Sequence, residues 1–167
     1  MNSNGLWEQR PDFLEEAQGS ITAPSGFQAA GVACGLKKNK GPDLALVVSD
    51  VPAVAAGVFT KNVVQGHSLQ LTRRQIAAGQ ARAIVINSGN ANACVGDVGM
   101  ADAMSMATQV AARLGCPSGQ VMTGSTGVIG HRLDMTAVSR GIGLAFERLS
   151  HAREAGHRSE ERRVGKE

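Results

Sequence analysis

The chain has 167 residues, a net charge of +3, 3% aromatic residues and no tyrosine. This length suits one domain with a substantial core, and the lack of aromatic residues argues against a stacking platform for single-stranded nucleic acid. Basic residues are scattered or interleaved with glutamates, which indicates a solvated surface and no nucleic-acid partner. No run approaches the roughly 20 apolar residues that span a membrane, so a cytoplasmic protein is expected.

In the first half of the chain, apolar runs predict strands and one change of period predicts a helix. Residues 1–20 are expected to form a loosely ordered leader. The predicted strands are 26–37, 44–49 and 54–60, with Pro52 marking a turn or an edge between the last two. A helix is expected over 68–78, and Gly79 is expected to cap its C-terminus.

The second half alternates strands with helices. A strand at 83–86 is expected to open into a polar loop, and a strand at 120–122 is expected to lead into a glycine-rich loop. Helices are predicted over 100–114, ended by Gly115 and Pro117, and over 133–149, with Asp134 as its N-cap. The mixture predicts an α/β fold, in which helices pack on a mixed sheet, with one domain over 21–150. Residues 151–167 are so polar that they are expected to form a tail that cannot pack.

Cysteines and histidines give no sign of a metal site. The three cysteines, Cys34, Cys94 and Cys116, include no CxxC pair, and the four histidines lack ligand spacing with carboxylates or cysteines. An odd number of cysteines with small or apolar neighbours suits a reducing compartment and argues against a disulfide framework. We therefore expect neither a metal nor a cofactor.

The stretch GSTGVIG, residues 124–130, has three glycines and two hydroxyl side chains. It lacks the lysine of a nucleotide P-loop and the GxGxxG spacing of a dinucleotide-binding turn. One interpretation is a structural turn that needs glycine. The other is an oxyanion hole, in which Thr126 and Gly127 supply donors to the negative oxygen of a tetrahedral intermediate.

The stretch NSGNANA, residues 87–93, follows a predicted strand directly, and loops in that position often form sites. Asn87 and Asn90 are the candidates for contact with a substrate, because their amides offer uncharged donors and acceptors. The alternative is a set of Asx-turns that hold a tight connection. Neither Ser88 nor Ser125 lies in the GxSxG pattern of a nucleophilic serine.

Three segments together resemble the amino-terminal half of the ornithine acetyltransferases of arginine biosynthesis, whose fold is DmpA/ArgJ-like. They are GVACGLKKNKGPDLALVVSDVPAVAAGVFTKNVV, ARAIVINSGNANACVGDVGMADA and GSTGVIG, and the likeness runs from about Gly26 to about Leu149. The resemblance implies acetyl transfer from N-acetylornithine to glutamate through a threonine acyl-enzyme, and some members also accept acetyl-CoA. It places the oxyanion hole at Thr126 and Gly127.

The resemblance also implies a second chain. Family members cleave themselves before a threonine, which becomes the nucleophile at the start of the second (beta) chain, and the two chains form an α2β2 particle. No such threonine segment occurs among these 167 residues, and the ending HRSEERRVGKE does not resemble the family. We therefore expect a truncated or chimeric chain, foreign after about Gly156, that is inactive alone.

Other interpretations stay open at this point. The chain could be the non-catalytic subunit of a split enzyme, or an anion-binding module that uses the glycine loop at a helix N-terminus. An aminopeptidase of the same broad architecture is a further alternative.

Overall fold

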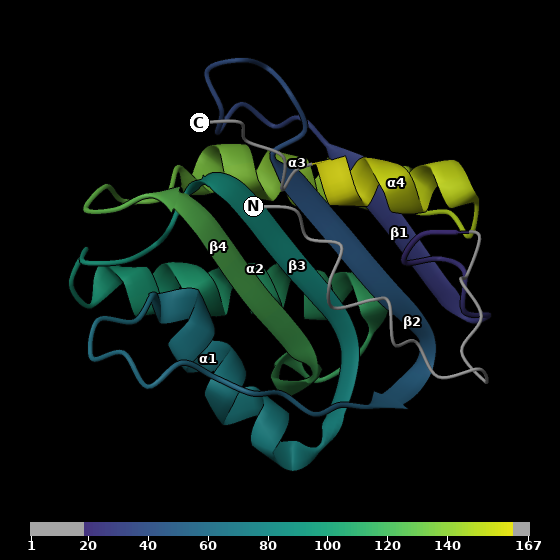
Figure 1. Ribbon diagram of the computed structural model, residues 1–167, viewed down its shortest axis with the longest axis horizontal. Helices are drawn as coiled ribbons and strands as arrows, with labels where there is room; N and C mark the ends of the chain where they lie inside the picture. The colour runs from purple at the N-terminus through teal and green to yellow at the C-terminus, as the bar shows by residue number, and fades with distance from the viewer. Residues whose placement is uncertain (1–18, 162–167) are drawn as a thin grey trace, which may run out of the picture.

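A four-stranded sheet forms the centre of the computed structural model, which describes residues 19–161 (Figure 1). The strand order is β1-β2-β3-β4, with bounds Phe27–Val32, Leu44–Val54, Gln80–Asn90 and Val121–Val128. The helices are α1 His67–Gln75, α2 Val98–Leu114, α3 Met135–Glu147 and α4 Arg153–Glu161, with short 3-10 turns η2 Ile76–Ala78 and η3 Ser118–Gln120. The predicted α/β class, a mixed sheet packed by helices, is confirmed.

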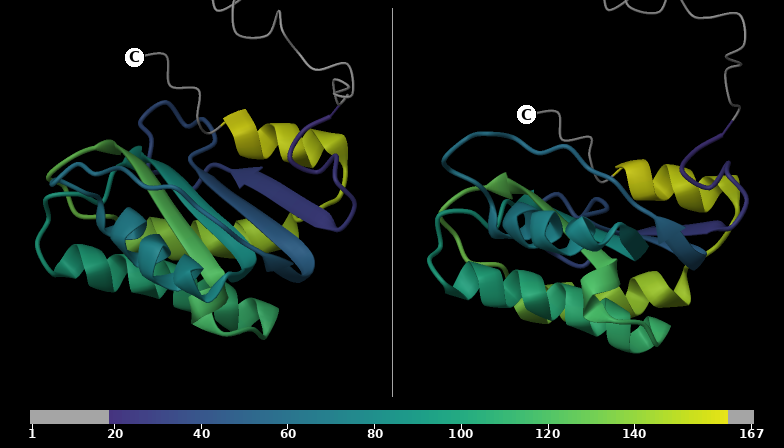
Figure 2. Two further views of the ribbon diagram at one scale, coloured as in Figure 1. Left: turned by 60° about the horizontal axis from the view of Figure 1, so that its bottom comes forward. Right: turned by 90° about the horizontal axis from the view of Figure 1, so that it is seen from below.

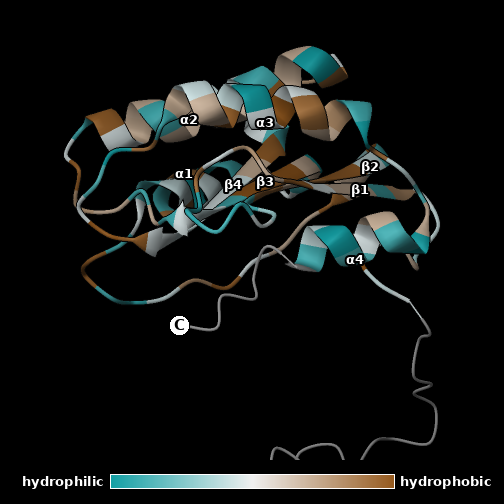
Figure 3. Cartoon of the chain, turned by 90° about the horizontal axis from the view of Figure 1, so that it is seen from above, coloured by the Kyte–Doolittle hydropathy of each residue, from teal (hydrophilic) through white to brown (hydrophobic). Residues whose placement is uncertain are grey.

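The helices cover the two faces of the sheet unequally. α2 and α3 lie across one face, called here the inner face, and α4 lies on the opposite, outer face beside β1 (Figures 2 and 3). α1 packs against β4 at the other edge of the sheet. Because α4 reaches β1 and β2, the outer face of β3 leaves Ile84 41% exposed.

The core lies between the inner face and the helices, and it follows the alternation of strand side chains. Inner-face residues pack on buried residues of α2 and α3. The sheet supplies Leu44, Leu46, Val48, Ala83, Val85 and Val121, and the helices supply Met106, Ala107, Val110, Val138, Ile142 and Ala145. Burying each large aliphatic side chain contributes roughly 1.5–3 kcal/mol, so this layer supplies most of the free energy that holds the helices against the sheet.

The predicted helix caps are confirmed, because local chemistry decides them, although the helix expected over 100–114 begins at Val98 and the one expected over 133–149 spans Met135–Glu147. The Oδ1 atom of Asp134 accepts hydrogen bonds of 3.0 Å from the amides of Thr136 and Ala137, which makes it the N-cap of α3. Gly79 and Gly115 end the two earlier helical segments with φ angles of 71° and 64°. A residue with a side chain is strained in that left-handed conformation.

The strand bounds correct several expectations. β2 continues through Pro52 to Val54, with an irregular pairing between Val48 and Ala53, so Pro52 is not a turn. Residues 55–60 form no strand, and the segment 55–66 arches over the outer side of the sheet (Figure 2). β3 and β4 are longer than predicted, because residues 87–90 and 124–128, expected as loops, continue their strands.

The expectation that residues 151–167 cannot pack is wrong for α4. Ala155, Gly156 and Ser159 are buried, and the helix lies against β1. The reason is the size of these residues, because small side chains let a polar helix bring its backbone close to the sheet. Residues 162–167 of the expected tail, and residues 1–18 of the expected leader, lie outside the described residues.

Replacing Gly31 in β1 with alanine should displace α4. An added Cβ would meet the carbonyl group of Arg158 and would lie 2.8 Å from the amide nitrogen of Ser159. We expect the free energy of unfolding, measured by urea denaturation, to fall by about 3 kcal/mol. Gly119→Ala is the control, because nothing lies within 4 Å of its added Cβ. Equal stabilities of the two variants would contradict the packing described for α4.

Candidate functional site

The ends of β3 and β4 bring the two polar motifs of the sequence together. These strands are neighbours and parallel, so they end at the same edge of the sheet. The register pairs Asn87 with Ser125, Ser88 with Thr126, and Gly89 with Gly127. NSGNANA and GSTGVIG therefore form one site.

Thr126 and Gly127 lie in β4 rather than in the loop that the glycines predict. Both are exposed, as is the next residue, Val128. β4 is the last strand in the sheet order, so within residues 19–161 it pairs with β3 alone. The candidate oxyanion-hole residues are therefore partly engaged in the sheet and yet open to solvent.

Two glycines allow β3 and β4 to approach closely beside Thr126. Gly127 has a φ of 129° and Gly89 a φ of 106°, conformations that favour glycine. An added Cβ on Gly127 would contact the carbonyl carbon of Gly89 and lie 2.6 Å from the amide nitrogen of Asn90. On Gly89 it would lie 3.0 Å from the carbonyl oxygen of Leu36. The backbones of three segments are thus stacked with no room for side chains.

The loop that packs on Gly89 is held by Asp43, which is fully buried. Its Oδ1 accepts a hydrogen bond from the amide of Cys34 at 2.7 Å. Its Oδ2 accepts from the amides of Gly35, Leu36 and Lys37 at 3.0, 2.7 and 3.0 Å. The main chain of Asp43 also accepts from the amide of Ser88 at 2.8 Å. Asp43 therefore joins the loop 34–37, through its carboxylate, to β3, through its main-chain carbonyl.

These contacts shift the pKa values of Asp43 and Cys34 in opposite directions. Burial alone would raise the pKa of Asp43, but hydrogen bonds from Cys34, Lys37 and Leu36 outweigh burial and lower that pKa. Burial, followed by the adjacent Asp43, raises the pKa of the Cys34 thiol to about 12. A thiol that stays protonated at neutral pH is a poor nucleophile, so Cys34 is not a candidate for covalent catalysis.

Asn87 points into the protein and has no exposed surface. Its Nδ2 donates to the carbonyl oxygen of Asn90 at 2.9 Å, and its Oδ1 accepts from the Ser125 hydroxyl at 2.6 Å. Ser125 contacts Ser68 of α1 at 2.8 Å, between the two hydroxyl oxygens. Ser68 in turn lies 3.5 Å from the Nδ2 of Asn92. The amide of Asn87 thus belongs to a chain of buried and part-buried hydrogen bonds that links β3, β4 and α1.

Asn90 holds the segment that follows β4. Its Nδ2 donates to the carbonyl oxygens of His131 and Arg132 at 2.8 and 3.2 Å, and its Oδ1 accepts from the amide of Asn92 at 2.8 Å. Arg132 also forms a bidentate ion pair with the buried Asp102 of α2, with both N–O distances at 3.1 Å. These bonds resemble the Asx-turn alternative, since the asparagine side chains bind neighbouring backbone.

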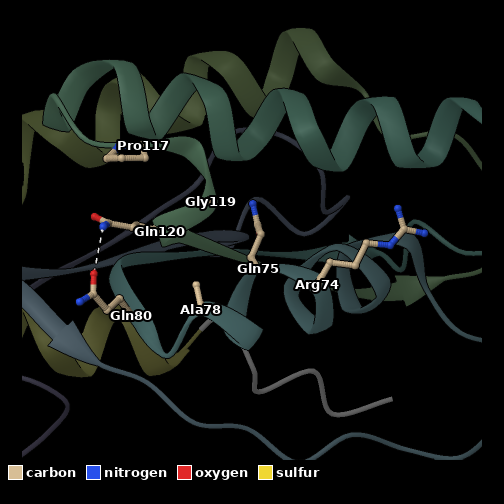
Figure 4. Close-up of a pocket in the computed structure, with 7 residues that line it drawn as sticks. All are labelled: Arg74, Gln75, Ala78, Gln80, Pro117, Gly119 and Gln120. Atoms are coloured by element: carbon tan, nitrogen blue, oxygen red, sulfur yellow. Dashed lines mark hydrogen bonds between the residues drawn. The ribbon is translucent and has the colours of Figure 1, made fainter.

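A cavity of about 470 Å³ lies at the other end of β3 and β4 (Figure 4). Its lining combines one cation, three amides and small residues, namely Arg74, Gln75, Gln80, Gln120, Ala78, Pro117 and Gly119. The side chains of Gln80 and Gln120 face one another, 3.5 Å apart between Oε1 and Nε2. This cavity includes none of the residues that the sequence singled out, so it is separate from the candidate site.

A comparison with known protein families decides to which family this chain belongs. The model of the ArgJ family matches residues 28–160. The chain belongs to the ArgJ family. The match extends beyond Gly156 to residue 160, so the expected foreign ending does not begin at about Gly156.

Curated ArgJ proteins are also similar in sequence to this chain. The chain is 49% identical over 137 residues to the arginine biosynthesis bifunctional protein ArgJ of Synechococcus sp., covering 81% of this chain and 33% of the relative. It is 48% identical over 143 residues to the protein of the same name from Mycobacterium leprae, covering 82% of this chain and 35% of the relative. The chain therefore spans about one third of the length of these ArgJ relatives.

Solved ArgJ structures have the same fold. The ornithine acetyltransferase of Mycobacterium tuberculosis, complexed with ornithine, is 37% identical with a TM-score of 0.86, covering 89% of this chain and 80% of that chain. The arginine biosynthesis bifunctional protein of Bacillus halodurans is 37% identical with a TM-score of 0.84, covering 92% of this chain and 80% of that chain. The expected family and its fold are confirmed.

Two further findings concern residues 19–161 only. None of their helices is both long and apolar enough to cross a membrane. They contain no cluster of three histidines, cysteines or carboxylates that could bind a metal ion.

Sequence reasoning missed three residues that support the candidate site from its buried side. Asp43 and Ser68 belong to no motif, and Asn92 lies in NSGNANA but was not singled out. Their partners lie up to 57 residues away, in the case of the Ser68–Ser125 contact. One local signal was available for Asp43, since a carboxylate directly before the apolar run 44–48 must find donors when the strand is buried.

Proposed function

We propose that this chain forms the amino-terminal part of an ornithine acetyltransferase that moves the acetyl group of N-acetylornithine to glutamate. Family membership supports the reaction, and the exposed Thr126–Gly127 stretch at the edge of β4 carries the assignment of the site. Of the related proteins, the Mycobacterium tuberculosis structure is described as an ornithine acetyltransferase complexed with ornithine.

The proposed chemistry divides the transfer into two steps. The hydroxyl of a threonine outside this chain attacks the acetyl carbonyl, and the carbon–nitrogen bond to ornithine breaks as its amine takes a proton. The amine of glutamate then attacks the acyl-enzyme and regenerates the threonine. In both steps the carbonyl oxygen becomes negative, and Thr126 and Gly127 supply donors to it. Acetyl-CoA is a second candidate acyl donor for the first step.

We assign direct stabilisation of the intermediate to Thr126 and Gly127 and a structural role to Asn87. The absence of exposed surface on Asn87 supports this change from the expected substrate contact. Asn90 is 9% exposed, and its amide is bonded to backbone groups. Both asparagines therefore act through the position of β3 and β4.

The missing nucleophile is proposed to come from a second chain that covers the outer face. Five valines on β2 and the arch 55–66 are largely exposed, namely Val51, Val54, Val58, Val63 and Val64 at 65, 94, 101, 97 and 62%. Residues 51–64 thus expose five large apolar side chains within one short stretch of chain, and concentrated apolar surface favours a partner. The lengths of the relatives support this. The matching stretch covers 80% of the solved Mycobacterium tuberculosis chain but only 33% of the Synechococcus relative. This difference favours a protein that is divided into two chains.

Joining residues 28–160 to the rest of the Synechococcus relative should give an active enzyme. We expect acetyl transfer from N-acetylornithine to glutamate in the chimera and none in the chain alone. Thr126→Ala in the chimera should lower kcat by about 10²–10³-fold, because a donor to the oxyanion is lost. Thr136→Ala, at an exposed position on α3, is the matched control.

Two outcomes would contradict the proposal. A folded chimera that transfers no acetyl group would show that this part does not complete an acetyltransferase site. Transfer by the chain alone, abolished by Thr126→Ala, would require a nucleophile within these residues. An activity unchanged by Thr126→Ala would remove Thr126 from the site but leave the reaction in place.

A further inference from the structure

We infer that Ser125 and Ser68 are positioning residues, which orient Thr126 and Gly127 through a chain of buried and part-buried hydrogen bonds that all run in one direction. This inference rests on the proposed function for its catalytic meaning. It concerns residues that face away from the open edge of β4 and that touch no substrate.

The direction of each hydrogen bond follows from the two ends of the chain. The Nδ2 of Asn87 donates to the carbonyl oxygen of Asn90, so the Oδ1 of Asn87 is the acceptor on its other side. Ser125 uses its single proton on that Oδ1. Ser68 must therefore donate to the oxygen of Ser125, and its own oxygen is left to accept from the Nδ2 of Asn92. Each of the two serine hydroxyl protons therefore has one acceptor.

Burial makes these bonds hard to exchange for water. Asn87 and Asn92 have no exposed surface, and Ser68 is 2% exposed. α1 is also bound to β4 one turn away, where the Thr72 hydroxyl donates to the carbonyl oxygen of Thr123 and accepts from the Thr123 amide, both at 2.8 Å. A buried hydroxyl that loses its partner is costly, so the arrangement resists displacement.

Beyond Thr123, the end of β4 has no buried apolar side chain that specifies which way its residues face. The stretch from Gly124 to Gly127 contains two glycines, two hydroxyl residues and no apolar side chain. Strand register is normally specified by apolar residues on the buried face, and it is weakly specified in glycine-rich strands. The bonds to Asn87 and Ser68 supply the missing preference, because they draw Ser125 to the inner side of the sheet.

The orientation of Ser125 determines that of Thr126. Successive side chains of a strand point to opposite faces, so an inward Ser125 places Thr126 on the outer side. Thr126 is exposed, and so is Ile84 on the outer face of the neighbouring strand β3. Ser125 therefore acts as an inward anchor for an outward oxyanion hole.

The test uses Ser125→Ala and Ser68→Ala, with Ser139→Ala as control. Ser139 is a part-buried serine on α3 whose hydroxyl donates to the carbonyl oxygen of Met135, far from β4 in the fold. In the chimera, Ser125→Ala should lower kcat by about 10²-fold with KM changed less than about twofold, because the oxyanion donors are misaligned while substrate binding is kept. Ser68→Ala, which leaves the Ser125–Asn87 bond, should have a smaller effect of about 10-fold.

A conservative variant separates the hydroxyl from mere packing. Ser125→Thr keeps the donor and should restore kcat to within about threefold of the unmodified chimera. Equal kcat values for Ser125→Ala and Ser139→Ala would overturn the inference. So would a loss of kcat in Ser125→Thr as large as the loss in Ser125→Ala. If Ser125→Ala does not fold, the split between kcat and KM in Ser68→Ala decides the matter.

A second readout on the full chain alone does not depend on activity. In the amide correlation spectrum, Ser68→Ala should shift or split the signals of Thr126 and Gly127, which are remote from it in sequence, whereas Ser139→Ala should leave them in place. Unmoved signals would overturn the positioning role even if the chimera is active. An inactive chimera in which these signals do move would refute the proposed function and leave the structural part of the inference standing.

Discussion

Gly127→Ala is expected to lower the free energy of unfolding by about 4 kcal/mol and to abolish acetyl transfer by the chimera. The added Cβ would contact the backbone of Gly89 and lie 2.6 Å from the amide nitrogen of Asn90, so main chain would have to move. The φ of 129° adds strain for any residue with a side chain. Urea denaturation of the chain and kinetics of the chimera measure the two effects.

Gly130→Ala separates the clash from the backbone strain. Gly130 also has a positive φ, of 80°, but nothing lies within 4 Å of an added Cβ. We expect it to be destabilised by about 1 kcal/mol, from conformational strain alone. If the two glycine variants lose the same stability, β3 and β4 do not approach as closely as described, and the backbone geometry proposed for the oxyanion hole is wrong.

Asp43→Asn is expected to lower the free energy of unfolding by about 3–5 kcal/mol. The carboxylate accepts hydrogen bonds from four backbone amides, those of Cys34, Gly35, Leu36 and Lys37. An amide has one acceptor oxygen, and its NH₂ group would face further donors, so at least one buried N–H would lose its partner. Asp134→Asn is the matched control and should change stability by less than about 0.5 kcal/mol, because asparagine and aspartate are equally good N-caps.

The same carboxylate should make the chain sensitive to acid. The pKa of Asp43 in the folded chain is lowered from its ordinary value of 3.8, since the hydrogen bonds outweigh burial. A lowered pKa means that Asp43 contributes its full stability above pH 3.8 and loses it as the pH falls through the folded value. Stability measured against pH should therefore drop less steeply below pH 3.8 in Asp43→Asn than in the unmodified chain. Parallel curves would contradict the role assigned to Asp43.

Local sequence signals predicted the helices of this chain better than its strands. Asp134, Gly79 and Gly115 mark helix ends through bonds and angles within a few residues, and the structure has all three where they were expected. Glycine and asparagine in the two motifs indicated loops, yet residues 87–90 and 124–128 are strands. Propensity gave way here because each strand gains its hydrogen bonds from the other.

The resemblance to the ornithine acetyltransferases was available from residues 26–149 alone, whereas the polar helix α4 was not anticipated. The expected tail lacks large apolar residues, which normally indicate packing. α4 packs with Ala155, Gly156 and Ser159 against β1, because Gly31 opens space for its backbone. A glycine in one element and small residues in another, more than 120 positions apart, signal nothing until the fold brings them together.

By itself, the sequence determined the family, the α/β class, the helix caps at Gly79, Gly115 and Asp134, and the two motifs that form the candidate site. Each of these depends on residue types or on contacts within a few positions. Only the tertiary structure decided that the motifs are adjacent, that Asn87 is buried, and that Asp43, Ser68 and Asn92 support the site. The parallel pairing of β3 with β4 creates that neighbourhood, and a hydrogen bond between distant segments leaves no periodic trace in a single chain.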